Sequence, residues 1–335
     1  MATYREVKGY SVKSVSSDPA NVKEGQIWYN SSTQKIKVAP LIQAWASGDN
    51  LNTTRRGIGG AGTQTAGLAC AGFVSTFPVS QVTEEYDGSS WTNGNNMGSG
   101  HYVAGTDGTQ TAAMHAGGYS NPGGLPANRS AAAETYDGTN WSEGPDLNEA
   151  RYNTIYAGTT TAGVLAGGTG AAPTPYGRNE SEDWDGSSWT AGNTIGTARY
   201  TFAFGAGTQT AGLIAGGFDT PPAARVTLCE EYNGTSWSEV NNCNTARNNG
   251  GMAGIQTAAL MFGGSTGSDS AATESYDGTN WTTLGASLAT ARGAGSSFGT
   301  QTAAAYAGGH PSGSNTNVTE EFTDSGATVR TVDVS

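Results

Sequence analysis

Glutamate recurs at six regularly spaced positions of this 335-residue chain. Six carboxylates brought together could bind a metal ion, and two of them could act as a general acid and a general base. A carboxylate that is half-buried beside an arginine is more simply explained as an ion pair. The six glutamates are Glu84, Glu134, Glu182, Glu230, Glu274 and Glu320.

A periodic arginine accompanies these glutamates. Arg151, Arg199 and Arg247 each lie ten residues after a tryptophan, and Arg292 lies eleven residues after one. Each glutamate lies two residues before an aromatic residue, so both side chains point to the same face of a strand. We therefore expect buried Glu–Arg pairs, with no catalytic residue and no bound metal or cofactor. One copy has His101 at the arginine position, and its pair should be weaker or absent.

The elements that position these residues belong to a unit that recurs six times. Its copies begin at Gly62, Gly108, Gly158, Gly207, Gly254 and Gly299. Each begins with a turn like Gly-Thr-Gln-Thr and continues through an apolar stretch to a double glycine, which is Ala71-Gly72 in the first copy. After a variable loop come Glu-x-Tyr-Asp-Gly and, in five copies, a tryptophan. A repeat of about 50 residues with several short strands predicts a β-propeller, because one such unit cannot bury its own sheet faces.

The sixth copy lacks its tryptophan, and Trp45 supplies a candidate from the other end of the chain. Arg55 lies ten residues after Trp45, which is the spacing of the other copies. We therefore expect residues 41–61 to complete the blade that begins at 299–335 and to start the first blade. The predicted fold is all-β: a six-bladed propeller closed by a clasp of N- and C-terminal strands. Closure would remove open sheet edges.

Within a blade, the Asp-Gly or Asn-Gly step after the aromatic residue is expected to form a two-residue hairpin turn. The double glycine should end the second strand where blades crowd together and a Cβ would clash. Trp141, Trp189 and Trp237 are expected to pack between blades. The three cysteines have no metal-ligand spacing, and Cys70 is expected to be a small core residue.

The charge is unevenly distributed. The net charge is −12, but residues 1–40 carry six basic and three acidic residues, whereas residues 41–335 carry ten basic and 25 acidic residues. No lysine follows Lys37. An acidic domain without lysine does not neutralise phosphates, so nucleic acid and anionic membranes are poor partners. The sequence has no apolar run for membrane insertion and no signal peptide at its start.

The order of double glycine, Glu-x-Tyr-Asp, tryptophan and arginine resembles kelch repeats over residues 41–335. Some kelch-like propellers are copper oxidases, but that activity needs a set of histidine and tyrosine ligands. This chain has three histidines, His101, His115 and His310, each in a different copy. A sialidase-like enzyme would need three clustered arginines, whereas these arginines are in register. We expect no enzyme, and a glycan-active propeller stays the alternative.

A second resemblance concerns the N-terminal segment. Residues 25–38 read as strand, polar turn and strand, and they precede Gly-rich repeats with Gly-Thr-Gln-Thr turns. This combination resembles tail-fibre and other virion proteins of tailed bacteriophages, notably marine ones. It implies a virion protein that is made in the host cytoplasm and recognises the host surface. A capsid or tail decoration protein without a ligand is a further alternative.

Two regions are expected to make contacts. Residues 1–40 form a short β-hairpin anchor that attaches to other virion proteins, and the chain is expected to form a homo-oligomer. The variable loops after the double glycines, on the rigid propeller of residues 41–335, would bind a cell-surface glycan or another receptor. The candidate contact residues are Phe77, Tyr119, Asn128, Arg129, Tyr176, Arg178, Asp219, Arg225 and His310.

Overall fold

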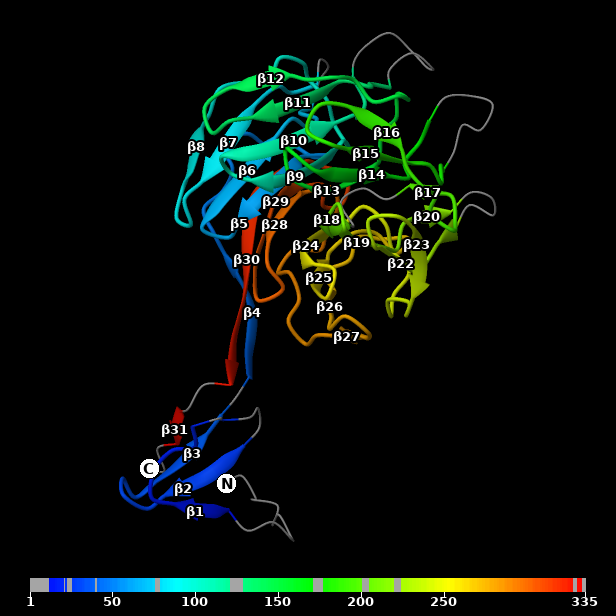
Figure 1. Ribbon diagram of the computed structural model, residues 1–335. Helices are drawn as coiled ribbons and strands as arrows, with labels where there is room; N and C mark the ends of the chain where they lie inside the picture. Colours follow the sequence, from blue (N-terminus) through cyan, green and yellow to red (C-terminus); the bar gives the residue numbers. More distant parts are fainter. Residues whose placement is uncertain are drawn as a thin grey trace. The chain divides into compact units, whose positions relative to one another are not determined.

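The computed structural model describes residues 12–20, 22, 26–39, 41–75, 79–120, 129–170, 177–200, 205–219, 224–327 and 330–332. The regular secondary structure of these residues consists of β-strands alone (Figure 1). The chain divides into two compact units. The terminal unit consists of Met1–Ala44 and Thr323–Ser335, and the main unit of Trp45–Phe322.

Six four-stranded sheets, numbered here 1 to 6 in chain order, account for most strands. Sheet 1 contains β5 (Gly59–Thr63), β6 (Ala66–Cys70), β7 (Thr83–Tyr86) and β8 (Trp91–Asn93). Sheet 2 contains β9 (Gly105–Thr109), β10 (Ala112–Ala116), β11 (Ala133–Tyr136) and β12 (Trp141–Glu143). Sheet 3 contains β13 (Ile155–Gly158), β14 (Gly163–Ala166), β15 (Ser181–Trp184) and β16 (Trp189–Ala191).

Sheets 4 to 6 repeat this plan. Sheet 4 contains β18 (Gly205–Thr208), β19 (Ala211–Ala215), β22 (Cys229–Tyr232) and β23 (Trp237–Val240). Sheet 5 contains β24 (Gly251–Ile255), β25 (Ala258–Phe262), β26 (Thr273–Tyr276) and β27 (Trp281–Thr283). Sheet 6 contains β28 (Ser296–Gly299), β29 (Ala303–Gly309), β30 (Thr316–Ala327) and β4 (Leu41–Ser47). A small extra sheet joins β17 (Arg199–Tyr200), β20 (Phe218–Asp219) and β21 (Ala224–Arg225).

The first strands of the six sheets contact one another in the order β5, β9, β13, β18, β24 and β28, and β28 also contacts β5. The architecture is therefore all-β and resembles a β-propeller (Figure 1). Sheet 6 contains β4 from the N-terminal part of the chain, next to β30. Trp45 of β4 packs on Phe322 of β30, with ring centroids 5.5 Å apart.

The terminal unit has its own four-stranded sheet. β1 (Lys13–Val15) pairs in parallel with β2 (Ile27–Asn30), and β2 pairs antiparallel with β3 (Lys35–Val38). The last strand, β31 (Arg330–Val332), pairs antiparallel with β3. The strand–turn–strand expected here is present, but C-terminal residues widen it, so the compact unit differs from the expected division into 1–40 and 41–335. A two-stranded hairpin alone is marginally stable, and the added strands extend its sheet.

A small polar core holds the terminal unit together. Trp28 is buried, and its Nε1 donates to Asp18 Oδ1 at 2.9 Å. Asn30 Nδ2 donates to the same oxygen at 2.8 Å. These two hydrogen bonds, that of Asn30 first, lower the pKa of the Asp18 carboxyl because they favour its charged form. The segment that was expected to need an external surface therefore buries its own tryptophan.

The double glycine joins each sheet of the main unit to the next. The N–H of its second glycine donates to the carbonyl of the residue at the periodic arginine position of the following sheet. Gly264 illustrates the geometry: its φ is 91° and a Cβ would lie 2.6 Å from Asn248 O, so only glycine fits. The six bonds are Gly72–His101, Gly118–Arg151, Gly168–Arg199, Gly217–Arg247, Gly264–Arg292 and Gly309–Arg55, at 2.7–3.1 Å.

The turn after the aromatic residue differs from the expected two-residue hairpin. Tyr86 pairs directly with Trp91, so four residues form the connection. Asp87 Oδ1 accepts from the N–H groups of Ser89 and Ser90 at 2.8 and 2.7 Å. This side-chain turn, repeated at Asp137, Asp185, Asn233 and Asp277, explains the Asp/Asn at this position.

The tryptophans pack between sheets, as expected. Trp141 Nε1 donates to Thr83 Oγ1 of the preceding sheet at 2.8 Å, and Trp189 Nε1 donates to Pro145 O, in the segment after β12, at 3.1 Å. Trp237 packs on Ala157 and Val164 of sheet 3. Cys70 is fully buried, which confirms that it is a core residue.

Five of the six periodic glutamates form buried ion pairs with arginine. Arg247 Nη2 lies 2.6 Å from Glu274 Oε1, and both side chains are fully buried. The same arginine donates to the carbonyls of Gly263 and Ala272, so it joins the carboxylate to the main chain of its own sheet. The prediction is confirmed for Arg55–Glu84, Arg151–Glu182, Arg199–Glu230, Arg247–Glu274 and Arg292–Glu320.

Sheet 2 is the exception. Among the residues that the structure describes, no ion pair joins His101 to Glu134. Glu134 accepts from the N–H groups of Gly98 and Ser99 and from Ser99 Oγ, at 2.8–3.0 Å. Glu84 and Glu320 accept from two main-chain N–H groups in the same way, so sheet 2 differs in lacking the arginine. His101 lies beside a second buried histidine, His115, with ring centroids 5.8 Å apart. The two histidines, which belong to different copies of the repeat, therefore meet in one sheet.

Burial lowers the pKa of both histidines. For His101 the nearby Glu134 opposes this effect. For His115 burial, together with His101, lowers the pKa to about 3. His115 Nδ1 lies 2.7 Å from Thr106 Oγ1 and 3.6 Å from Cys70 Sγ. Its Nε2 and the Nδ1 of His101 have no hydrogen-bond partner among the described residues. Both imidazoles are therefore neutral in the folded protein at pH 7.

A second carboxylate links neighbouring sheets. The residue after the paired glutamate accepts a hydrogen bond from the tyrosine hydroxyl of the next sheet, as in Tyr276 to Glu231 at 2.9 Å. Four such couples exist among the described residues: Tyr86–Glu321, Tyr136–Glu85, Tyr232–Asp183 and Tyr276–Glu231. At the other two junctions both partners are missing together, as Thr135 with Trp184 and Ser275 with Phe322.

Candidate binding face

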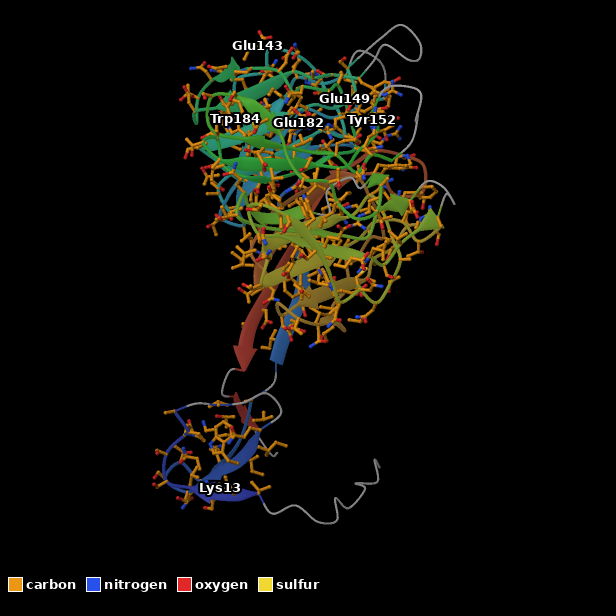
Figure 2. All side chains as sticks on the ribbon, turned by 45° about the vertical axis from the view of Figure 1, so that its right-hand side comes forward. Lys13, Glu143, Glu149, Tyr152, Glu182 and Trp184 are labelled. Atoms are coloured by element: carbon orange, nitrogen blue, oxygen red, sulfur yellow. The ribbon has the colours of Figure 1, made fainter. Side chains whose placement is uncertain are left out.

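The buried arginines hold one face of the main unit in place. The residue that follows each arginine, or His101, pairs with the residue that follows the double glycine. Figure 2 shows this face through Tyr152, which lies at the opposite end of sheet 3 from Trp184. The six pairs are Arg56–Phe73, Tyr102–Tyr119, Tyr152–Thr169, Tyr200–Phe218, Asn248–Ser265 and Gly293–His310. The variable loops begin at these positions.

Aromatic side chains form an arc over sheets 1 to 3. Phe73 and Tyr102 have ring centroids 5.8 Å apart, Tyr102 and Tyr119 5.2 Å, and Tyr119 and Tyr152 5.4 Å. The guanidinium of Arg56 lies 4.9 Å from the ring centre of Phe73. Burial, followed by the neighbouring tyrosines, raises the pKa of Tyr102, so its hydroxyl stays protonated at neutral pH. The arc thus offers apolar rings with hydroxyl ends.

Arg225 connects sheets 4 and 5 on this face. Its guanidinium lies 5.8 Å from the ring centre of Phe218, which stacks on Tyr200 at 5.3 Å. Its Nε donates to Asn248 Oδ1 at 3.0 Å, and its Nη2 donates to Ser265 Oγ at 3.1 Å. Arg225 therefore orients polar side chains of the neighbouring sheet.

A hollow of about 330 Å³ lies between the six sheets on the same face. All six sheets, or the segments that lead into them, contribute to it. The walls contain two tyrosines, several asparagines and one each of arginine, aspartate and histidine. The lining residues are Arg56, Gly57, Tyr102, Val103, Asn153, Tyr200, Asn248, Asn249, Ser265, Asp269, Gly293, Ala294 and His310.

Main-chain hydrogen bonds link the base of this hollow. Asn153 N donates to Val103 O at 2.7 Å, and Val103 N donates to Gly57 O at 3.0 Å. Gly57 N donates to Ala294 O, and Ala294 N to Asn249 O, both at 2.6 Å. All five residues have a positive φ of 55–64°. The left-handed conformation, unusual for the β-branched Val103 and for Ala294, recurs because each residue turns into the first strand of its sheet.

A second, smaller cavity of about 70 Å³ lies among the first strands. Asp107 lines it, and burial raises the pKa of this carboxyl to about 7 despite hydrogen bonds from Gly158 N and Gly108 N. A carboxyl with such a pKa is a candidate general acid. Both of its oxygens are engaged by main-chain donors, and the cavity is far smaller than the roughly 300 Å³ of a typical ligand site. We interpret Asp107 as a link between sheets 2 and 3.

Two of the nine predicted contact residues lie at the hollow. His310 lines it, and Arg225 holds Asn248 and Ser265 of its wall. Tyr119 and Arg129 belong to the aromatic arc, where the Arg129 guanidinium lies 6.0 Å from the ring centre of Tyr152. Phe77, Asn128 and Tyr176 lie outside the described residues.

The remaining two residues are engaged within the fold. Arg178 forms ion pairs with Glu149 and Glu180, and Figure 2 shows Glu149 close to Tyr152 on this face. Asp219 pairs through its main chain with Arg199 in the small sheet. Neither residue lines the hollow.

Sequence reasoning missed most residues of the hollow. It looked for binding residues in the long variable loops and not beside the periodic arginines. A signal was present: the arginine position is nearly constant, whereas the next residue varies from Arg56 and Tyr102 to Asn248 and Gly293. Variation beside a fixed anchor indicates a surface position that the fold does not constrain.

Among the described residues, no group of three or more histidine, cysteine, aspartate or glutamate side chains is arranged to hold a metal ion. The same part of the chain has no helix with the length and apolar character needed to cross a membrane. Comparison of the sequence with protein-family models and with curated proteins gives no match.

Proposed function

We propose that this chain is a virion protein of a tailed bacteriophage that binds the host cell surface through the face described above. The receptor would be a surface glycan or a protein, and the chain would bind it without changing it chemically. The observation that carries the proposal is the gathering of aromatic, cationic and amide side chains from all six sheets on one face. Recognition residues on a rigid scaffold are the usual arrangement of binding proteins.

The scaffold in this proposal is a six-bladed propeller of kelch type, with sheets 1 to 6 as its blades. Contacts between the last and the first sheet support a closed ring. Gln64 of sheet 1 donates to Ala304 O and Phe322 O of sheet 6, and Tyr86 OH donates to Glu321. The position of β4 beside β30 supports a clasp between the two ends of the chain. A closed ring leaves only short sheet edges, at the outer strand of each blade.

Attachment to the particle is assigned to the terminal unit. Its sequence includes the phage-like strand–turn–strand. Residues 1–40 carry more basic than acidic residues, whereas the rest of the chain is acidic. Val12 and Ile27 of this unit are about half exposed. An acidic, partly apolar surface on another virion protein would suit both features. Attachment of several copies to one particle would add weak contacts to the host by effective concentration.

Two measurements test this function. Antibodies against the full chain, detected by electron microscopy, should label purified phage particles that encode it at the fibre or tail. The labelled full-length protein should bind saturably to cells of a susceptible host and reduce adsorption of the phage. Label on the capsid without binding to cells would favour a decoration protein. Release of sugars from host polysaccharide would favour a glycan-active enzyme, and no label on any particle would exclude a virion role.

A further inference from the structure

The hollow at the centre of the binding face has the composition of a sugar site. Tyr102 and Tyr200 contribute aromatic rings from sheets 2 and 4, while Asn153, Asn248 and Asn249 contribute amides. Its volume of about 330 Å³ is at the lower end of the roughly 300–1,000 Å³ of small-molecule sites. Such a site suits one or two sugar rings and not a long segment of a polymer.

The charges of the residues that line the hollow balance, and Arg225 behind its wall is engaged by Asn248 and Ser265. Arg56 contributes one positive charge and Asp269 one negative charge, and Asp269 also accepts a hydrogen bond from Ser312 N at 2.6 Å. Residues 41–335 carry ten basic and 25 acidic residues, so an anionic ligand would approach a repulsive field. Amides, hydroxyls and aromatic rings without a surplus charge favour an uncharged ligand that is rich in hydroxyl groups.

Part of this polar lining is already oriented. Because Arg225 Nε donates to Asn248 Oδ1, the amide is held with its oxygen toward the guanidinium. The Nδ2 group of Asn248 makes no hydrogen bond among the described residues, so its donors are left for a ligand. An oriented donor loses little conformational freedom on binding, and it discriminates against ligands that lack the matching hydroxyl.

The base of the hollow determines how a ligand enters. The hollow is bounded at its base by a hydrogen-bonded main chain, that of Gly57, Val103, Asn153, Asn249 and Ala294. The cavity among the first strands has a volume of only about 70 Å³. A chain cannot pass through such a constriction. A ligand must therefore enter from the face with one end first.

We propose that the hollow binds the terminal residue of an uncharged saccharide. This inference rests on the proposed host-binding function and specifies its ligand. The aromatic arc would contact the next residues of the glycan outside the hollow, and Tyr102 belongs to both regions.

The test uses the full-length chain on an array of glycans that share a core and differ in the terminal residue, with sialylated and sulfated members. Hits are then measured by calorimetry for Tyr102→Ala and Asp269→Asn of the hollow, for Tyr119→Ala of the arc and for the control Thr282→Ala. Tyr119 touches Tyr102 at 5.2 Å but does not line the hollow, and Thr282 is an exposed residue of β27 that belongs to neither region. We expect the two hollow variants to weaken binding by about tenfold or more, the loss of one good contact, Tyr119→Ala to weaken it by a smaller factor, and Thr282→Ala to leave it unchanged. Melting curves identify any variant that fails to fold, and Asp269→Asn alters only a partly exposed side chain.

The outcomes separate the two proposals. Uncharged glycans that bind only with one type of terminal residue, and bind less to the hollow variants, support the inference. Equal binding whatever the terminal residue, preference for anionic glycans, or greater loss in Tyr119→Ala than in the hollow variants would overturn it. Binding to host cells without binding to any glycan would overturn the inference and keep the host-binding function. Absence of binding to both would overturn both.

Discussion

Glu274 of sheet 5 and Glu134 of sheet 2 occupy equivalent buried positions, but only Glu274 has an arginine. In sheet 5 the guanidinium of Arg247 supplies charge and also binds two main-chain carbonyls. In both sheets main-chain N–H groups donate to the carboxylate, but in sheet 2 a neutral imidazole occupies the place of the guanidinium. The repeat thus tolerates a buried carboxylate with and without an arginine, and the two sheets should respond differently to mutation and to acid.

The histidine at position 101 is accompanied by a second change. His115 occupies a position that is apolar or aromatic in the other sheets, as in Leu165 of sheet 3 and Tyr306 of sheet 6. In sheet 6 the arginine and the aromatic side chain coexist, with the Arg292 guanidinium 4.9 Å from the ring centre of Tyr306. An aromatic ring at this position is therefore compatible with arginine, and sheet 2 differs in having two titratable rings.

The largest expected effect comes from breaking an ion pair. Arg247→Met would leave Glu274 buried without a counter-charge, and such a loss costs about 3–5 kcal/mol of unfolding free energy. The counterpart His101→Leu should cost clearly less, because His101 is neutral and forms no ion pair with Glu134. The measurement is the urea unfolding midpoint of each variant at pH 7. Equal losses of stability in the two variants would show that the ion pair with arginine does not make sheet 5 more dependent on this position than sheet 2.

Acid should destabilise the protein through sheet 2. The folded pKa of His115 lies near 3, below the unfolded value of about 6.5. The unfolded chain therefore binds a proton first, and stability present above pH 6.5 is lost as the pH falls toward 3. The expected slope for one such group is about 1.4 kcal/mol per pH unit, or about 2 kcal/mol between pH 6.5 and 5.

The matched variant for this acid effect is His115→Leu, which copies Leu165 of sheet 3. Unfolding midpoints between pH 7.5 and 5 should fall less steeply in the variant than in the natural chain. Asp107, whose pKa burial raises to about 7, also titrates in this window, but with the opposite sign and in both proteins alike, so the difference between the two proteins reports His115. If both proteins lose stability at the same rate, His115 is not the source of the acid sensitivity.

The sequence was sufficient to predict the periodic part of the structure. Six periodic glutamates and five periodic arginines predicted five buried pairs and an exception at His101, because a buried carboxylate requires a partner whatever the details of packing. The aromatic positions likewise placed Trp141 and Trp189 between sheets. Repetition makes each inference redundant, since an error in one copy is corrected by five others.

The features that the sequence did not predict depend on a single copy or on distant contacts. His101 and His115 lie in different copies of the repeat, and only the folded sheet brings them within 5.8 Å. The hollow combines between one and four residues from each sheet, so no local pattern marks it. The return of β31 to β3 joins residues about 300 positions apart, and the short segment Arg330–Val332, with one apolar residue, gave no sign of its partner.

A smaller gain is expected from giving sheet 2 its arginine. His101→Arg should raise the unfolding free energy by about 1 kcal/mol at pH 7, because the new ion pair must offset the desolvation of the guanidinium. His101→Lys is the control: an ammonium group carries the charge, but it cannot bind a carboxylate and two carbonyls in one plane. Thermal melting of the three proteins gives the comparison. A lysine variant as stable as the arginine variant would show that charge alone matters.

The smallest effect concerns the couples between neighbouring sheets. Tyr276 donates to Glu231 across the junction of sheets 4 and 5. At the junction of sheets 5 and 6, Phe322 occupies the tyrosine position and Ser275 the carboxylate position, so this bond cannot form. Removing the hydroxyl in Tyr276→Phe should cost about 1 kcal/mol of unfolding free energy. Burial together with Glu231 raises the pKa of Tyr276, so the bond persists through neutral pH.

The converse experiment adds the missing bond by a double change, Ser275→Glu with Phe322→Tyr. Each single change adds a polar group without a partner and should be neutral or destabilising, whereas the pair should recover about 1 kcal/mol. A double-mutant cycle on unfolding midpoints measures that coupling. Coupling near zero would mean that the joint absence of both partners at this junction does not reflect the energy of the bond.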